Sequence, residues 1–421
     1  MTEQLLHYVW KHQLFNTSEL KTVDGEKILI LKNGIHNHQS GPDFSNAKIK
    51  IGEIIFAGSV EIHQSSSDFE KHQHQNDAAY KNVILHVVYE HDKNISQQIP
   101  TLELKGIIPL YIIRNYENLI KRENKIACAG SIQNTSTLLW EQVFNRMALN
   151  RLERKVEFVE ATLKQNNQNW EETFYQLLAK NFGMKVNGEA FFELAKSIPI
   201  NVLAKQKYSL LQLEALLLGQ SGLLNEIFSD AYAVQLQKEY QFLQHKFSLQ
   251  PIPANYWKMA RMRPQNFPPL RIAQLAALIF QSSHLLSKVL ECSAINDLKQ
   301  LFQVQPSDYW QQHFKLDTDS IKSKKQIGDS TIENFIINTI VPIVFAYGKI
   351  RHEDDFQDKA VQWLNDLSAE KNNIITAWKN YNIKPQNAFQ SQALIELKNE
   401  FCEKKNCLGC LIGQTLIKQS I

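Results

Sequence analysis

Two acidic residues near the start of the chain stand where they can bind one metal ion together. Asp43 is followed eighteen residues later by Glu61. The segments 47–51 and 54–62 between them are rich in apolar and β-branched residues and are predicted to be adjacent strands. Two carboxylates at the ends of adjacent strands can share one divalent cation. A cation bound in this way is the minimum that metal-assisted hydrolysis of a phosphodiester requires.

His63 is expected to lie on the same face of its strand as Glu61, because side chains two positions apart point to the same side. A neutral imidazole beside a carboxylate can position or deprotonate a water molecule, or it can bind a metal itself. Lys48 and Lys50 share one face of the preceding strand and are an alternative source of positive charge. The simplest alternative is that Asp43 only begins a turn and that Glu61 is an ordinary surface residue of its strand.

The next segment, residues 65–81, is polar and rich in histidine, and it is predicted to form a helix. Two acids and two histidines lie in it at helical spacings: Asp68, His72, His74 and Asp77. Each acid–histidine pair shares a helical face, so we expect these side chains to support the metal-binding carboxylates through hydrogen bonds. Two alternatives are a zinc site that uses His63, His72 or His74 and a solvated polar helix.

The order of elements in the first third of the chain is helix, strand, strand, strand, helix, strand. An amphipathic helix is predicted at residues 2–15 and a short strand at residues 27–31. The apolar run at residues 83–89 is typical of a strand covered on both faces. This order, with Pro42-Asp43 opening the second strand and Glu61-Ile62-His63 in the third, resembles the PD-(D/E)XK nuclease superfamily.

The resemblance covers about residues 1–120, and residues 75–80 are similar to the Gln…Tyr helix of its RecB-type branch. It implies a metal-dependent nuclease or phosphodiesterase in which Asp43 and Glu61 hold Mg²⁺ or Mn²⁺. His63 stands where lysine is usual and would position or deprotonate the attacking water. The alternative is a non-catalytic nucleic-acid-binding or scaffold protein on a degenerate nuclease fold. DNA or RNA as the substrate, and endo or exo action, are left open.

The whole sequence also resembles a family of uncharacterised proteins, found mostly in Bacteroidetes, that is defined only as a domain of unknown function. The residues that carry this second resemblance run from Gly41 through Ser66-Ser67-Asp68-Phe69 to the apolar run at residues 83–89. This family implies no activity.

The length of 421 residues exceeds that of one ordinary core, and hydrophobic and charged contents of 43% and 21% are typical of globular proteins. From about residue 137 the pattern changes to long helical periods, beginning with residues 138–165 and 170–182. We therefore expect an α+β protein with two domains. A nuclease-like α/β domain is expected at residues 1–125, and a large all-α region at residues 126–421.

Nucleic acid is the expected partner, as the resemblance implies. The net charge of +3 neither supports nor excludes this partner, because a dedicated nucleic-acid-binding domain is usually more basic. Residues 1–15 lack the apolar run of a secretory signal, and no stretch approaches 18 consecutive apolar residues. The chain is therefore expected to be cytoplasmic, with no membrane association, and its oligomeric state is left open.

Four of the five cysteines form a second pattern that suits a metal. Cys402, Cys407 and Cys410 are spaced C-x4-C-x2-C, and Cys128 lies just beyond the nuclease-like segment, whereas Cys292 is embedded in a helical apolar pattern. Four thiolates can bind Zn²⁺ or an iron–sulfur cluster. Some RecB-type nucleases join one remote cysteine to three clustered ones in this manner. The alternative is a set of ordinary thiols near a chain end.

Three arginines surround a proline-containing loop: Arg261, Arg263 and Arg271. Pro264 and Pro268 interrupt the helical pattern there, so the loop is expected to lead into a helix near residue 270. Guanidinium groups bind phosphate through paired hydrogen bonds, so this loop is a candidate phosphate-binding site. The alternative is that the arginines form inter-domain salt bridges and pack in the interior.

Overall fold

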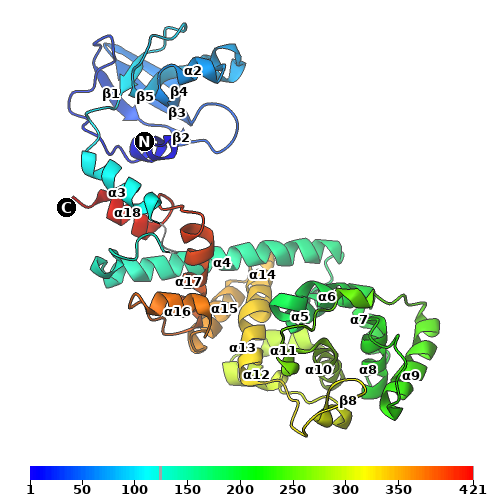
Figure 1. Cartoon of the computed structure of the whole chain (residues 1–421). Coiled ribbons are helices and arrows are strands. Elements are labelled where there is room, and N and C mark those ends of the chain that lie inside the picture. The colour runs from blue at the N-terminus through cyan, green and yellow to red at the C-terminus, as the bar shows by residue number, and fades with distance from the viewer. Residues whose placement is uncertain (123–125, 421) are drawn as a thin grey trace. The chain divides into compact units, whose positions relative to one another are not determined.

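The computed structural model describes residues 1–122 and 126–420, and the chain divides into two compact units (Figure 1). The first unit contains Met1–Val143, Asn380–Asn382 and Glu396–Ile421, and the second contains Phe144–Lys379 and Ile383–Ile395. The expected division at residue 125 differs from the observed one. The first unit runs on to Val143, and the C-terminal segment returns to it.

The first unit is built around a sheet of mixed direction. Its strands are, in chain order, β1 (Ile28–Lys32), β2 (Ile35–His36), β3 (Phe44–Ile51), β4 (Ile54–Ser65), β5 (Val83–Glu90) and β6 (Thr101–Glu103). In space their order is β1-β3-β4-β5-β6, and β2 pairs with the start of β3. β1, β3 and β4 are antiparallel neighbours, whereas β4, β5 and β6 run parallel. The strands predicted at residues 47–51, 54–62 and 83–89 are confirmed.

Helix α1 (Glu3–Lys11) packs its apolar face into the core of this unit and contacts β4. Its buried residues are Leu5, Leu6, Tyr8, Val9 and Trp10. Thr2 caps the helix by accepting a hydrogen bond from the Leu5 amide. Each large apolar side chain buried in this way contributes about 1.5–3 kcal/mol, so the helical spacing of these residues fixes which face of α1 meets the core. Glu3 and His7 lie one turn apart on the less buried side.

The segment between β4 and β5 differs from the single helix predicted at residues 65–81. It contains one short helix and two 3-10 turns: α2 (Asp68–Lys71), η1 (His74–Asn76) and η2 (Ala78–Asn82). Gln73 adopts the left-handed conformation with φ of 59°, and Asp77 is extended, so the helix is interrupted twice. The segment still forms the crossover that two parallel neighbouring strands require.

The C-terminal segment completes the first unit. Helix α3 (Leu110–Lys121) contacts α18 (Leu411–Lys418). The side-chain amide of Asn115 donates to the carbonyl groups of Leu416, Ile417 and Gln419, at 3.2, 3.3 and 2.9 Å. These carbonyl groups lie at the end of α18, where the helix itself supplies no partner. Asn115 therefore anchors the end of the chain to α3.

The second unit is mainly helical, so the large helical C-terminal region is confirmed. Its helices are α4 (Thr137–Gln165, which begins in the first unit), α5 (Trp170–Phe182), α6 (Met184–Ser197), α7 (Ile200–Ala204), α8 (Leu210–Gln220), α9 (Ala231–Phe247), α10 (Pro268–Gln281), α11 (Leu285–Glu291), α12 (Ile295–Leu301), α13 (Asp329–Phe335), α14 (Val341–Arg351), α15 (Asp354–Asp366), α16 (Asn373–Lys379) and α17 (Ala388–Glu396). A short antiparallel hairpin of β7 (His313–Lys315) and β8 (Thr318–Asp319) departs from the expected all-α composition.

One helix of the second unit is long and apolar. α13, a π-helical segment and α14 form a continuous helix, Asp329–Arg351, whose length and composition would allow it to cross a membrane. In the structure, 72% of its apolar 18-residue window is buried inside the protein. The core helix of a soluble protein can combine length, composition and burial in the same way. These properties therefore do not distinguish a membrane-spanning helix from a buried core helix.

Candidate metal centre

Asp43 and Glu61 meet across two antiparallel strands. Phe44 of β3 pairs with Val60 of β4, so the residues next to this pair, Asp43 and Glu61, are neighbours. The Asp43 amide donates to Glu61 Oε2 at 3.1 Å, and the Ile62 amide donates to Asp43 Oδ2 at 2.9 Å. Each carboxylate thus binds the backbone of the opposite strand with one oxygen and keeps the other oxygen for further contacts.

Two histidines lie beside the second oxygen of Glu61, and a third lies beside one of them. Glu61 Oε1 lies 3.5 Å from His63 Nε2 and 3.4 Å from His74 Nε2. His72 Nδ1 lies 3.2 Å from His63 Nε2. One ligand nitrogen from each of the three histidines lies within 4.8 Å of the other two, and the three range from buried His63 to exposed His72.

These distances are those expected around one metal ion. Donor atoms that each lie 2.0–2.1 Å from a tetrahedral zinc are about 3.4 Å from one another. The spacings of Glu61 Oε1 from its two histidine neighbours, and of His63 from His72, lie between 3.2 and 3.5 Å. Imidazole nitrogens with a carboxylate oxygen are a ligand set for transition metals. Glu61, His63 and His74 therefore form a candidate metal centre, with His72 as a candidate fourth ligand beside His63 and Asp43 beside Glu61.

The interruption of the helix after α2 makes this convergence feasible. In a continuous helix, residues two positions apart project about 200° from each other around the axis, which would separate His72 from His74. The left-handed Gln73 between them reverses the chain instead. The His74 ring then stacks on the Tyr80 ring, with ring centres 3.9 Å apart, which fixes its orientation.

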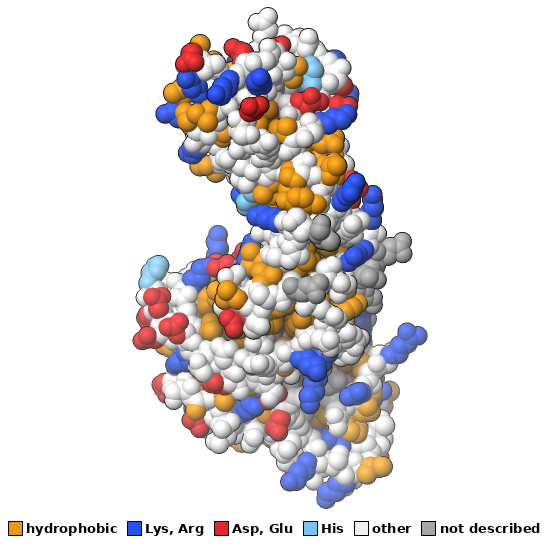
Figure 2. Space-filling view, turned by 90° about the vertical axis from the view of Figure 1, so that its left-hand side faces the viewer, with side chains coloured by type: hydrophobic (Ala, Val, Ile, Leu, Met, Phe, Trp, Pro, Cys, Tyr) orange, Lys and Arg blue, Asp and Glu red, His pale blue; other side chains and the backbone are white. Residues whose placement is uncertain are grey.

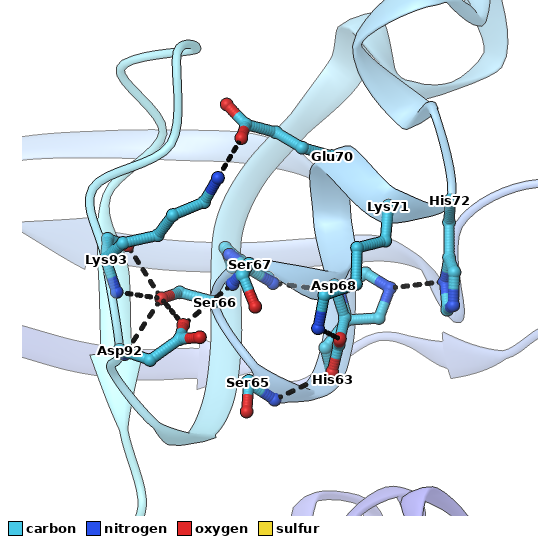
Figure 3. A network of polar contacts seen from close by, with 11 residues as sticks. His63, Ser65, Ser66, Ser67, Asp68, Glu70, Lys71, His72, Asp92 and Lys93 are labelled. Atoms are coloured by element: carbon cyan, nitrogen blue, oxygen red, sulfur yellow. Dashed lines mark hydrogen bonds and ion pairs between the residues drawn. The ribbon is translucent and has the colours of Figure 1, made fainter.

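A network of hydrogen bonds holds the start of α2 (Figure 3). The buried Ser66 hydroxyl donates to Asp92 Oδ1 at 2.7 Å, and the Asp92 and Lys93 amides donate to the Ser66 oxygen at 3.2 and 3.1 Å. The Lys93 ammonium pairs with Glu70 of α2 at 2.6 Å. Because Ser66 precedes α2 and Lys93 follows β5, the network ties the helix to the end of that strand and positions His72.

A second buried histidine lies behind His63. His63 Nδ1 and His86 Nε2 are 2.9 Å apart, and both side chains are buried. The Phe69 ring packs edge-on against both imidazoles, so neither ring can turn without a clash. A His63 that binds a metal through Nε2 would carry its proton on Nδ1 and donate it to His86. This is the type of contact that orients ligand histidines in metalloproteins.

Burial and like charges oppose ionisation at this place. Burial, and then the Asp43 charge, raises the pKa of Glu61 to about 9. Burial, and then His72 and His74, lowers the pKa of His63 to about 4. Without a cation, Glu61 therefore keeps its proton near neutral pH and His63 is uncharged. A bound cation would favour the Glu61 carboxylate, and it needs the neutral imidazole.

Helix α1 adds two residues that the sequence analysis missed. His7 Nε2 is buried 3.2 Å from Asp43 Oδ2, without hydrogen-bond geometry and with no hydrogen-bond partner in the described part of the chain. The pKa of Glu3 is raised, chiefly by burial, with His7 and Asp43 as its closest electrostatic influences. One signal pointed here: nine of the 13 histidines lie within residues 1–91, and His7 is one of them.

The residues expected to support the centre divide into two groups. His72 and His74 lie at ligand distance. Asp68 and Asp77 instead bind the backbone: Asp68 accepts from the Ser65 amide at 3.0 Å, and Asp77 caps η2 by accepting from the Ala79 amide at 2.9 Å. His63, expected to act on water, is 1% exposed. Its enclosure suits a metal ligand better than a base that meets substrate.

A family model matches residues 3–373, which is most of the chain. The chain belongs to the family described as "Protein of unknown function (DUF2851)". The expected membership of a family defined as a domain of unknown function is thereby confirmed. The part matched to DUF2851 contains every residue of the candidate metal centre and ends before Cys402. No curated protein and no solved structure matches the chain.

Apart from the candidate metal centre, the structure brings four cysteines together in the first unit of this DUF2851 chain. Cys128 follows α3, Cys402 ends the π-helical segment η8 (Leu397–Cys402), and Cys407 and Cys410 lead into α18. These four residues line one small cavity. Cys292 follows α11 in the second unit. The four cysteines expected to share a metal are therefore neighbours in space.

The three arginines expected to bind phosphate lie in the second unit and have different surroundings. Arg261 and Arg263 are exposed. Arg271 is buried and donates to Asn266 Oδ1 at 2.7 Å and to Gln274 Oε1 at 3.0 Å. Burial lowers its pKa to about 10. Arg271 therefore holds the loop before α10, whereas Arg261 and Arg263 are open to a ligand.

Proposed function

We propose that the protein is a metal-dependent hydrolase that cleaves phosphodiester bonds in nucleic acid. The observation that carries the proposal is the convergence of Glu61 Oε1 with His63 Nε2 and His74 Nε2 at the spacing of metal ligands, with Asp43 alongside. A bound divalent metal lowers the pKa of a coordinated water towards neutrality and offsets the charge on phosphoryl oxygens.

The donor set favours Zn²⁺ or Mn²⁺ over Mg²⁺. Mg²⁺ is bound in proteins chiefly through oxygen atoms, whereas imidazole is a common ligand of zinc and other transition metals. Asp43 and Glu61 alone would suit Mg²⁺ or Mn²⁺, as expected from the sequence. His63 and His74 beside Glu61, with His72 next to His63, move that preference towards Zn²⁺. Mn²⁺ is the metal that both the carboxylates alone and the carboxylate–histidine set would accept.

The sheet supports a PD-(D/E)XK type of core. Helix α1 precedes three antiparallel strands, β1, β3 and β4, and a crossover then leads to β5, which is parallel to β4. This is the order of helix, three strands, helix and strand that the resemblance implies. Asp43 stands directly before the second of these strands, and Glu61 lies within the third.

His63 differs in its role from the lysine that the superfamily has at this place. It is enclosed by Glu61, His72 and His86, so we assign it to the metal. Lys50, considered as a substitute, pairs with Glu53 at the far end of β3. Lys50 therefore does not supply the missing charge.

His7 is the base that faces the centre from α1. Its Nε2 lies 3.2 Å from Asp43 Oδ2 and has no hydrogen-bond partner in the described ranges. We assign His7 the transfer of a proton from the attacking water, with Asp43 orienting its ring.

Contacts to substrate phosphate would be made close to the centre. On the face of the first unit shown at the top of Figure 2, basic and acidic side chains are interspersed, so the described residues form no broad basic surface on this face of the unit. Near Asp43, however, lies His36, whose pKa is lowered by burial and then by the neighbouring His38, His7 and Lys11. This group of basic side chains is our candidate for the contact with substrate phosphate.

A cleavage assay tests the proposal. Metal-free protein is incubated with mixed DNA and RNA, single- and double-stranded, with Zn²⁺, Mn²⁺ or Mg²⁺ added separately. Cleavage is expected with Zn²⁺ or Mn²⁺ and is expected to be lost in Glu61→Gln. The matched control is Glu53→Gln, the same change at an exposed residue of the β3–β4 turn, which should cleave like the wild type. Tight metal binding without any wild-type cleavage would contradict a hydrolase.

The rival function is a non-catalytic nucleic-acid-binding or scaffold protein with a structural metal. Structural zinc sites have four protein ligands, whereas catalytic sites keep one position for water. His72 decides between them, since its position beside His63 would close the coordination of Glu61, His63 and His74. In an enzyme, His72→Ala should keep the metal and cleavage. In a scaffold, the same change should release the metal.

A further inference from the structure

The cavity lined by four cysteines is small. Cys128, Cys402, Cys407 and Cys410 line it together with Phe401 and Gly413, and its volume is about 20 Å³. A volume of this size holds about one water-sized particle. All of the cysteines are thiols, and thiols are weak hydrogen-bonding groups. Such a wall offers little to water but suits a thiophilic metal ion.

The loop that carries three of these cysteines has a defined backbone. The Cys410 amide donates to the Cys407 carbonyl group at 3.3 Å, and the Gly409 amide donates to Asn406 Oδ1 at 3.1 Å. A Cβ atom on Gly413 would lie 2.2 Å from the Cys407 carbonyl oxygen, so only glycine lets α18 approach this loop. The turn therefore presents Cys407 and Cys410 at the C-x2-C spacing found in structural zinc sites.

Three basic side chains lie close enough to the cavity to influence its cysteines electrostatically: Arg122 acts on Cys128, Lys398 on Cys402 and Lys405 on Cys407. Their positive charges would offset the negative charge of a metal bound by four thiolates.

Each of these three basic side chains also has a polar partner. Arg122 donates to the Ala127 carbonyl group at 3.3 Å, and Lys405 donates to the Ile120 carbonyl group at 2.8 Å. Lys398 pairs with Glu403 at 2.9 Å. Arg122 and Lys405 therefore join the loop of Cys128, the end of α3 and the C-terminal loop around the same cavity.

We propose that Cys128, Cys402, Cys407 and Cys410 bind one Zn²⁺ ion that fastens the C-terminal segment to the loop after α3. One ion suits the volume, whereas an iron–sulfur cluster with its several atoms needs more room. Four thiolates around Zn²⁺ carry a net charge of −2, which Arg122, Lys398 and Lys405 offset. The site is separate from the centre at Glu61, and neither the fold nor the activity argued there depends on it.

Cobalt substitution tests the site directly. Zinc and iron are measured in full-length protein, and Co²⁺ is then exchanged for the bound metal. Thiolate-to-cobalt charge-transfer absorption in the near ultraviolet is expected, because histidine and carboxylate ligands do not give it. Cys128→Ser and Cys407→Ser should each remove this absorption. Cys292→Ser, the matched control in the second unit, and His74→Ala, which alters the other centre, should both keep it.

Alkylation of the cysteines in the wild type tests the proposed zinc site even if the serine variants do not fold. In the zinc-loaded wild type, the four cysteines should resist alkylation, and a chelator should expose them, whereas Cys292 should react equally in both states. Equal alkylation of all five cysteines in both states would overturn the proposal. So would charge-transfer absorption that persists in both serine variants, or the visible absorption of an iron–sulfur cluster.

Discussion

The backbone amide of Asp43 donates to Glu61 Oε2 at 3.1 Å, while the carboxylate of Asp43 accepts from the amide that follows Glu61. This reciprocal contact holds both acids at one point of the β3–β4 ladder. It leaves Glu61 Oε1 directed at His63 and His74. The candidate centre thus depends on strand register first and on side-chain chemistry second.

Neutralising either acid is expected to abolish metal binding at this centre. Asp43→Asn and Glu61→Gln keep the size of the side chain and an oxygen for the backbone contact, but they remove the charge that attracts a cation. The fold should survive in both. Calorimetric titration with Zn²⁺ and Mn²⁺ measures the effect, with Glu53→Gln as the unaffected control. Unchanged binding in both variants would show that the metal sits elsewhere.

Replacing His86 should weaken metal binding without harming the fold. His86 holds His63 through a contact of 2.9 Å, and its own Nδ1 is buried without a hydrogen-bond partner in the described structure. In His86→Leu the metal affinity is expected to fall about 10–100-fold, as for other residues that orient a ligand histidine. Thermal stability should be kept or should rise. His12→Leu, at an exposed histidine, is the control that should leave affinity unchanged.

Asp92→Asn should lower stability in a pH-dependent way. Burial tends to raise the pKa of Asp92, but hydrogen bonds from Ser67 and Ser66 outweigh it and hold the pKa below its ordinary value. A lowered folded-state pKa contributes stability that is present above about pH 3.8 and is lost as pH falls towards the folded-state value. The loss in Asp92→Asn should be about 1 kcal/mol at neutral pH, since this carboxylate is exposed to solvent.

Urea unfolding of wild type and Asp92→Asn between about pH 2 and pH 7 provides the measurement for that prediction, because the difference is expected to shrink only below about pH 3.8. The two stability curves should approach each other at the acid end. A constant difference across the whole range would show that Asp92 acts through packing and not through its charge.

Arg271→Met should destabilise the second unit. The change leaves Asn266 Oδ1 and Gln274 Oε1 without their donor, and each such loss costs about 1–3 kcal/mol for a buried group. Chemical denaturation measures the effect, with Arg263→Met at an exposed position as the control. If Arg271 instead served phosphate binding, its variant would keep its stability and lose affinity for nucleic acid.

The strands could be predicted because their sequences alone determine them. Residues 83–89 are apolar throughout and form β5, whose Val83, Leu85, Val87 and Val88 are buried. Alternation placed Glu61 and His63 on one face, and the structure has them on the same side of β4, 3.5 Å apart. The approach of Asp43 to Glu61 followed from the same two strands.

The histidine segment could not be predicted, because its course depends on two backbone choices. The left-handed Gln73 carries no sequence signal, because glutamine is not a typical turn residue, and Asp77, a common turn residue, is one of several polar residues in the segment. They convert an expected helix into turns that direct His72 and His74 at one point. The part played by His7 depends on how α1 packs on β4, which local patterns do not give.

The proximity of Cys128 to Cys410 was suggested by cysteine spacing, but its cause was not visible in the sequence. In the first unit, α18 packs against α3 with Ile412, Leu416 and Ile417 buried, and Asn115 of α3 donates to carbonyl groups at the end of α18. A single asparagine in a helix gives no sequence signal for such a contact. The boundary expected at residue 125 differs from the observed division for the same reason.

The most direct measurement is an anomalous difference map from crystals of the full-length protein soaked in Mn²⁺. The account predicts a peak within bonding distance of Glu61 Oε1, His63 Nε2 and His74 Nε2, and no peak there in crystals of Glu61→Gln. It would be contradicted by a map with no peak at this centre while Glu61 Oε1 stays at its present 3.4–3.5 Å from both histidines.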